Sequence, residues 1–157
     1  MQIVKKKQSE CSAENKKHYR PLQDKTPRYT VKEVAELLGI TTHAVRYYDN
    51  EGLVPDVMRG TGNARFFSEF NVGWLRVVHC LRETGLSIAG IKHYIDLSAQ
   101  GDETLEERCQ IIFAQEAVLQ QQIDDLNRQM EIMQYKKEYY IKLLEEHKKK
   151  KRNSNSK

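Results

Sequence analysis

The chain has 157 residues, of which 39% are hydrophobic and 31% are charged, and its formal net charge is +4. This length allows one modest core and one further long element, and no apolar run approaches the length of a membrane span. The Lys-rich start lacks the apolar segment of a secretory signal, and three cysteines in unrelated contexts do not indicate a disulfide framework. We therefore expect a cytoplasmic protein with no membrane partner.

The charge is unevenly distributed along the chain. Residues 1–28 carry 8 basic and 3 acidic residues, residues 148–157 carry 6 basic residues and no acid, and residues 29–147 carry 12 basic and 19 acidic residues. An acidic body does not hold nucleic acid by bulk attraction, so DNA binding would depend on a few placed basic groups and the tails. We expect residues 1–28 to be a disordered basic arm. It either follows phosphates or, as we favour, is a solvated extension or a mis-assigned start.

Residues 29–50 predict two short helices joined by a tight turn. Thr30 and Glu33 form a capping-box pattern, and Gly39 ends the first helix. We expect Thr42 to cap the second helix. On the first helix the apolar residues recur at helical spacing: Val31, Val34, Ala35 and Leu38. On the second, one face is polar and aromatic (His43, Arg46, Tyr47) and the other is expected to pack inward (Ala44, Val45, Tyr48). This pattern is typical of a helix-turn-helix, whose second helix enters the major groove, but small helical domains also contain such hairpins without binding DNA.

Residues 58–67 predict a short two-stranded wing. Two glycines and Asn63 supply residues that tolerate positive φ in the turn, and Arg59 and Arg65 lie on its two arms. Two arginines that flank a hairpin can clamp a phosphate backbone, although either could also be an ordinary surface charge.

Two more helices are expected next. Ser68 and Ser87 are their predicted N-caps, and residues 84–86 separate them. Their inward residues are predicted to complete one small core: Phe70, Trp74, Val77, Val78, Leu81, Ile88, Ile91, Tyr94 and Ile95.

A long helix is predicted from residue 103 to residue 147, opened by a capping box of Thr104 and Glu107. Its apolar seam alternates steps of four and three residues, which is the heptad pattern of a coiled coil. A helix of this length exposes more apolar surface than the small domain can cover, so we expect a homodimer. The expected dimerisation residues are Ile112, Leu119, Ile123, Leu126, Met130 and Met133.

Two polar residues of opposite charge, Glu116 and Lys137, interrupt this seam. An antiparallel pair of helices could bring them together, whereas a parallel pair would stack like charges, so we expect an antiparallel coiled coil. Residues 148–157 are then expected to form a basic, disordered tail.

Several motifs together resemble one protein family. They are Tyr-Thr-Val at 29–31, Gly39 in the turn, Arg-Tyr-Tyr-Asp at 46–49 followed by Glu-Gly-Leu-Val-Pro at 51–55, the wing arginines, and Leu-Arg-Glu-Thr-Gly-Leu-Ser at 81–87. Residues 29 to about 97 resemble the winged helix-turn-helix DNA-binding domain of the MerR family of bacterial transcription regulators, and the helix after it resembles that family's dimerisation helix. The implied fold is mainly α. Three features depart from the pattern: the N-terminal arm, His43 in place of a frequent Lys, and Ala64 and Phe67 in place of wing tyrosines.

The resemblance implies a function and its residues. The DNA contacts would come from Thr42, His43, Arg46 and Tyr47 of the second helix and from Arg59 and Arg65 of the wing. Two DNA-binding domains on a palindromic promoter operator would distort over-long promoter DNA so that RNA polymerase can engage it.

Cysteine chemistry bears on what such a regulator would sense. Cys80 resembles the thiol of the single-cysteine branch of the family, which responds to aldehydes and other electrophiles, and its modification would repack the third helix. Arg76 and His79 would promote the thiolate of Cys80, but its position near the helix C-terminus opposes negative charge. On chemistry alone we therefore favour a structural cysteine. Cys109 is best interpreted as a small seam residue. A metal site is weakly supported because soft ligands do not converge, and we expect no cofactor.

Two other classes of function remain. An enzyme is poorly supported because the sequence shows no phosphate loop, no HExxH motif and no evident catalytic cluster, so no catalytic residue is assigned. A DNA tether without an effector, held by a coiled coil and basic tails, is the serious alternative.

Overall fold

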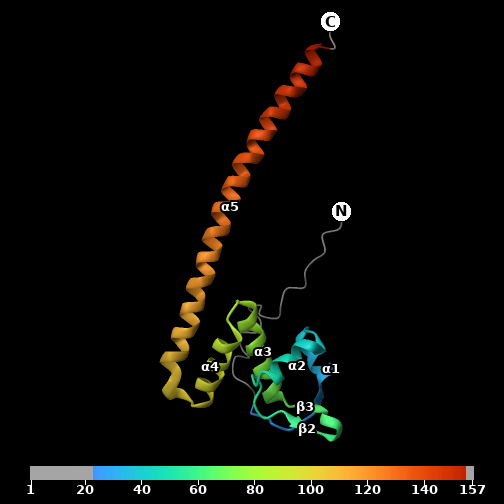
Figure 1. The fold of residues 1–157 in the computed structure, drawn as a ribbon, viewed down its shortest axis with the longest axis vertical. Coiled ribbons are helices and arrows are strands. Elements are labelled where there is room, and N and C mark those ends of the chain that lie inside the picture. Colours follow the sequence, from blue (N-terminus) through green and yellow to red (C-terminus); the bar gives the residue numbers. More distant parts are fainter. Residues whose placement is uncertain (1–22, 155–157) are drawn as a thin grey trace. The chain divides into compact units, whose positions relative to one another are not determined.

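The computed structural model describes residues 23–154, so most of the expected N-terminal arm and the last three residues lie outside the described part. The chain divides into two units, residues 1–112 and residues 113–157. The first contains the small domain (Figure 1). The second contains most of the long helix.

The helix-turn-helix is present with the expected capping of its first helix, α1 (Val31–Leu38). The backbone N–H of Thr30 donates to Glu33 Oε2 at 2.7 Å, and the Glu33 N–H donates to the Thr30 hydroxyl at 3.4 Å. Gly39 then ends α1 at φ 64°, in the left-handed region that glycine adopts without strain. Because these signals are local in sequence, they position α1 independently of the rest of the domain.

The second helix, α2 (Thr42–Asn50), begins one residue earlier than its predicted cap implied. The Thr41 hydroxyl accepts from the Ala44 N–H at 3.1 Å and is the N-cap, so the prediction of Thr42 as the cap is wrong. From the sequence alone, either of the two consecutive threonines could cap this helix. The inward face of α2 buries Val45 and Tyr48, as expected.

A three-stranded sheet contains the predicted wing. Strand β2 (Met58–Arg59) pairs antiparallel with β3 (Arg65–Phe67), and β3 also pairs with β1 (Tyr29–Thr30), which was not predicted from the sequence. The wing turn contains a short 3₁₀ helix, η2 (Thr61–Asn63). Gly62 and Asn63 have positive φ there, whereas Gly60 does not, so only one of the two glycines plays the expected role.

Helices α3 (Glu69–Glu83) and α4 (Ile88–Ala99) complete the domain, with Ser68 and Ser87 as their N-caps, as predicted. Their buried faces join α1, α2 and β3 in one hydrophobic core. The fully buried hydrophobic side chains of this core come from every helix of the domain, from β3 and from the segment between α2 and β2: Val34, Val45, Leu53, Phe67, Leu75, Val78 and Ile91. The sheet and α2 are therefore held by a common core.

The long helix α5 spans Leu105–Ser154 and comes after a 3₁₀ turn, η3 (Asp102–Thr104). The predicted capping box does not form, because the Thr104 hydroxyl donates to Leu97 O at 2.6 Å and Glu107 lies 3.2 Å from His93 Nε2. The helix also continues through residues 148–154, which were predicted to be a disordered tail. Lysines near a helix C-terminus interact favourably with its dipole, which is consistent with this extension.

Candidate DNA-binding surface

The outward face of α2 carries the residues expected to contact DNA. Thr42, His43, Arg46 and Tyr47 are all exposed, while Val45 and Tyr48 on the opposite face anchor the helix in the core. The helix is therefore rigidly mounted, and its first turns present a hydroxyl, an imidazole, a guanidinium and a phenol to solvent. These groups suit base edges and phosphates.

The two wing arginines are joined to α2 by one acidic residue, Asp49. Arg59 Nη2 lies 2.8 Å from Asp49 Oδ2, and Arg65 Nε donates to the same oxygen at 2.5 Å. Arg65 Nη2 also donates to Asn50 Oδ1 at 2.7 Å. The Asp49 side chain is 3% exposed, so this carboxylate is an internal anchor.

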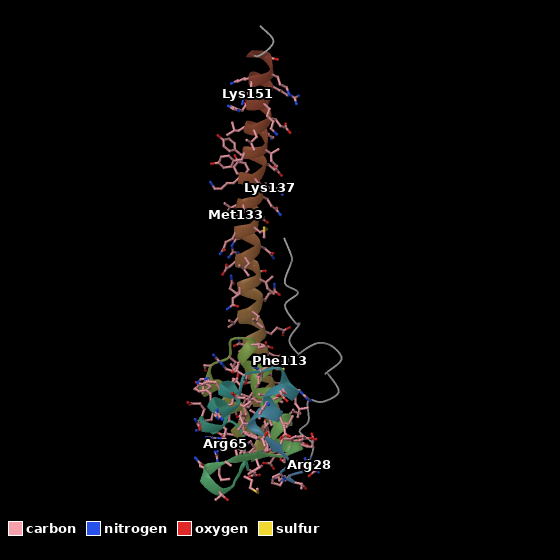
Figure 2. The ribbon with its side chains drawn as sticks, turned by 90° about the vertical axis from the view of Figure 1, so that its right-hand side faces the viewer. Arg28, Arg65, Phe113, Met133, Lys137 and Lys151 are labelled. Carbon is pink, nitrogen blue, oxygen red and sulfur yellow. The ribbon has the colours of Figure 1, made fainter. Side chains whose placement is uncertain are left out.

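The two wing arginines differ in how far their side chains are exposed to solvent. The Arg65 side chain is 16% exposed and that of Arg59 is 40% exposed. Figure 2 labels Arg65 in the small domain. Since one carboxylate faces two guanidinium groups, the wing keeps a net positive charge at a fixed place beside the end of α2. A fixed cation suits a phosphate better than a mobile one, because less side-chain entropy is lost on binding.

The wing itself is closely packed at Gly60. A Cβ atom at this position would lie 2.8 Å from Cε2 of Phe66, so the turn needs a residue without a side chain. The segment between α2 and β2 is held by Asn71, whose side-chain amide donates to Pro55 O at 2.6 Å. These contacts restrict the conformation of the wing turn and of the segment that leads into the wing.

Tyr48 connects α2 with α3. Its hydroxyl lies 3.5 Å from His79 Nδ1, and His79 Nε2 lies 3.7 Å from Glu83 Oε1. Burial raises the pKa of the Tyr48 phenol. The His79 ring therefore lies close to Tyr48 and Glu83. Its place next to Cys80 in the sequence is not evidence that it contacts the Cys80 sulfur.

The cysteines differ in state. Cys109 is half-buried and free, whereas Cys80 is disulfide-bonded. The sequence indicated no disulfide framework, so the disulfide at Cys80 was not predicted from it. Among residues 23–154, no group of three or more His, Cys, Asp or Glu side chains could hold a metal ion. No helix in this described part is long and apolar enough to cross a membrane.

Comparison with known proteins identifies the family. The family model described as MerR HTH family regulatory protein matches residues 29–98, and the model described as MerR, DNA binding matches residues 72–134. An uncharacterized HTH-type transcriptional regulator of Haemophilus influenzae is 36% identical over 114 residues, which cover 73% of this chain and 84% of that protein. This chain belongs to the MerR family. It is a DNA-binding transcription regulator.

Solved structures agree with this MerR assignment. The crystal structure of HiNmlR, a MerR family regulator lacking the sensor domain and bound to promoter DNA, is 36% identical, has a TM-score of 0.60, and matches 73% of this chain and 90% of that chain. A MerR-family regulator of Bacillus thuringiensis is also 36% identical, with a TM-score of 0.58 and coverage of 69% and 95%. The predicted fold class is confirmed: a helix-turn-helix with a wing, followed by a long helix.

Sequence reasoning missed Asp49 as a site residue, although a signal was present. Val45, Tyr48 and Asp49 share one face of α2 at helical spacing. An acid in a buried stripe needs a cationic partner, and two arginines occur within the next 16 residues. The individual DNA contacts of α2 and the wing stay predictions.

Proposed function

We propose that this MerR-family chain binds a palindromic promoter operator as an antiparallel homodimer and controls transcription by distorting the promoter DNA. The observation that carries the proposal is the joined surface of α2 and the wing, in which exposed Arg46 lies on the same helix as the Asp49 anchor of Arg59 and Arg65. Helix residues would read the major groove while the wing cations fix the protein on the phosphates.

The exposed seam of α5 supports the dimer. Leu126, Met130 and Met133 are 58–62% exposed, and Ile123 is 50% exposed. Apolar residues at heptad spacing on a 50-residue helix require a partner helix to leave water. A second copy of the chain is the simplest partner, and it would supply the second DNA-binding domain that a palindrome demands.

Two fixed DNA-binding domains could bend or untwist the DNA between their half-sites. Such deformation costs a few kcal/mol, which the protein contacts supply. On an over-long promoter, the change would let RNA polymerase engage both promoter elements. Regulation then requires that an effector change the relative placement of the two domains.

Cys80 is the proposed effector site, and thiol-reactive electrophiles such as aldehydes are the proposed effectors. Because Cys80 is held in a disulfide, a thiol reductant must first release it. The thiolate would then add to the aldehyde carbonyl carbon and the carbonyl oxygen would take up a proton, giving a hemithioacetal. Arg76 lies one turn earlier on α3, where a guanidinium favours the thiolate. The modified side chain would repack α3.

A DNA tether without an effector is the alternative from a different class. It draws support from the basic residues 148–152, which continue α5. A metal-responsive regulator is less well supported, although relatives include a probable heavy metal-dependent transcriptional regulator of Haemophilus influenzae, 26% identical over 106 residues.

Transcription in a purified system tests the proposal. A duplex is selected from a random pool with the purified protein, placed at the promoter of a reporter template, and transcribed with and without protein under reducing conditions. We expect a selected palindrome and a change in transcript level that depends on the length of the promoter spacer. Selection of no sequence, with binding lost on removal of residues 148–157, would favour the tether.

A further inference from the structure

The seam of α5 restricts how a second copy can pair with it. Its positions alternate steps of four and three residues from Leu105 to Leu144, so each has a counterpart at equal distance from the midpoint between Asp124 and Asp125. We infer that the second copy pairs in the register that faces Leu119 with Met130 of the partner subunit, and that charged and apolar residues flanking the seam hold this register. The inference rests on the proposed homodimer and adds its register.

The polar seam residues distinguish this register from its neighbours. Here Glu116 faces Met133 of the partner subunit. Lys137, labelled with Met133 in Figure 2, lies one turn beyond Met133 and shares its helix face because the two are four residues apart. Helical side chains lean toward the N-terminus of their own helix, so the Lys137 ammonium leans back toward Glu116. A shift of one heptad in one direction would move Lys137 roughly 10 Å further from Glu116 along the helices. A shift in the other direction would leave Lys137 three residues before the position that faces Glu116, so the two side chains, which lean toward their own N-termini, would lean apart. The inferred register is the one in which they lean together.

The flanking residues on one side of the seam agree with the same register. This position recurs every seven residues from Glu106 to Lys148, and in an antiparallel pair the two copies of it lie on the same side of the interface. Taken inward from both ends, the series pairs Glu106 with Lys148, Phe113 with Ile141, and Gln120 with Gln134. Each pair is therefore chemically compatible: an acid meets a base, an apolar side chain meets another, and an amide meets an amide.

The pairing also accounts for two exposed apolar residues outside the seam. Phe113 is 64% exposed and Ile141 is 46% exposed. In the inferred register, Ile141 of the partner subunit lies five residues, slightly more than one turn, beyond the position that faces Phe113. The two side chains lean toward each other, because each leans toward the N-terminus of its own helix. A register shifted by one heptad would place Phe113 against Lys148 or Gln134 instead. Burial of two such pairs per dimer favours the inferred register.

The helix dipole gives a separate reason for the two charges, because Glu106 lies in the first turn of α5 and Lys148 lies near its last turns. The two explanations oppose each other in a charge swap. If the dipole alone matters, Glu106→Lys and Lys148→Glu are each harmful and their combination is worse. If the residues pair across the dimer, the combination restores the attraction.

The charge swap is measured as the dimer dissociation constant of the full chain, from sedimentation over a dilution series at low salt. We expect each single variant to weaken the dimer about fivefold and the double variant to return to within about twofold of the unaltered protein. Glu107→Lys with Lys149→Glu is the control, one position further from the seam; Glu107→Lys also breaks the contact of Glu107 with His93 within one protomer, so only the additivity of the two effects is compared, and they should simply add. Additive effects at residues 106 and 148 would overturn the inferred pairing.

Cross-linking tests the register directly. In a chain whose three cysteines are replaced by serine, Leu119→Cys with Met130→Cys should form a covalent dimer on oxidation, whereas Leu119→Cys with Lys137→Cys, matched to the register one heptad away, should not. Cross-linking of the second pair alone would overturn the register and keep the dimer. A monomer at every concentration would overturn the homodimer as well.

Discussion

Arg65 Nε lies 2.5 Å from Asp49 Oδ2, so the wing is attached to the second helix of the helix-turn-helix through a carboxylate that is 3% exposed. Asp49 thereby positions the two cations that we propose for a DNA phosphate, while it adds a negative charge of its own to the same surface.

Asp49→Asn separates positioning from charge. The substitution keeps the shape of the side chain and makes the surface more positive by one charge, so bulk attraction alone would tighten DNA binding. We expect weaker binding instead, by roughly tenfold, because Arg59 and Arg65 lose a charged hydrogen-bond partner. Equilibrium titration of a fluorescent operator measures the change. Asp56→Asn is the control, since it adds the same charge at an exposed acid that pairs with Lys25. Tighter binding by Asp49→Asn would contradict the positioning role.

Substitution of Thr41 and of Thr42 separates two roles: Thr41 caps the helix, and Thr42 is expected to contact DNA. Thr41→Ala removes the hydroxyl that accepts from the Ala44 N–H and should cost about 1 kcal/mol of unfolding free energy. Thr42→Ala should leave the free energy of unfolding nearly unchanged and weaken operator binding. Urea unfolding and operator titration of both variants measure the two effects. The assignment fails if Thr42→Ala destabilises the protein as much as Thr41→Ala.

Stability at alkaline pH should depend on Tyr48. Burial raises the pKa of its phenol above the ordinary value of 10.0, so the folded state holds this proton more tightly than the unfolded state. The resulting stability is fully present below the unfolded pKa and is lost as pH rises through the folded pKa. Between about pH 9 and 12, we expect the unfolding free energy of Tyr48→Phe to fall less steeply than that of the unaltered protein. Parallel curves would show that the buried phenol does not contribute.

Cys80 should mediate any response to electrophiles. With the protein reduced, we expect formaldehyde or methylglyoxal to change transcription from the operator template, and Cys80→Ala to abolish the change while operator binding persists. Cys109→Ala is the control, because Cys109 is a free cysteine on α5 and should not be needed. An unchanged response in Cys80→Ala would remove the sensor and leave the DNA-binding function standing.

Local signals were predicted well from the sequence, and long-range ones were not. The caps Thr30, Ser68 and Ser87 and the stop at Gly39 depend on neighbouring residues alone, and the structure confirms them. Strand β1 has two residues and exists only because β3 pairs with it, so no periodicity could show it.

The errors have physical reasons of the same kind. The predicted capping box at Thr104 loses to tertiary partners, Leu97 O for Thr104 and His93 for Glu107. The role of Asp49 depends on residues 10 and 16 positions further along the chain. Composition gave residues 148–154 the character of a solvated tail, whereas a preceding helix with a basic end can continue through them.

Operator affinity over a range of salt concentrations is the most direct test of the central claim that α2 and the wing read a promoter sequence. The selected palindrome is compared with a scrambled duplex of the same composition, using the unaltered protein, Arg46→Ala, and Lys32→Ala as an exposed control on α1. We expect the palindrome to bind at least about a thousandfold more tightly than the scrambled duplex, and Arg46→Ala to lose most of that preference while Lys32→Ala keeps it. Equal affinity for both duplexes, with the same salt dependence in all three proteins, would contradict the claim.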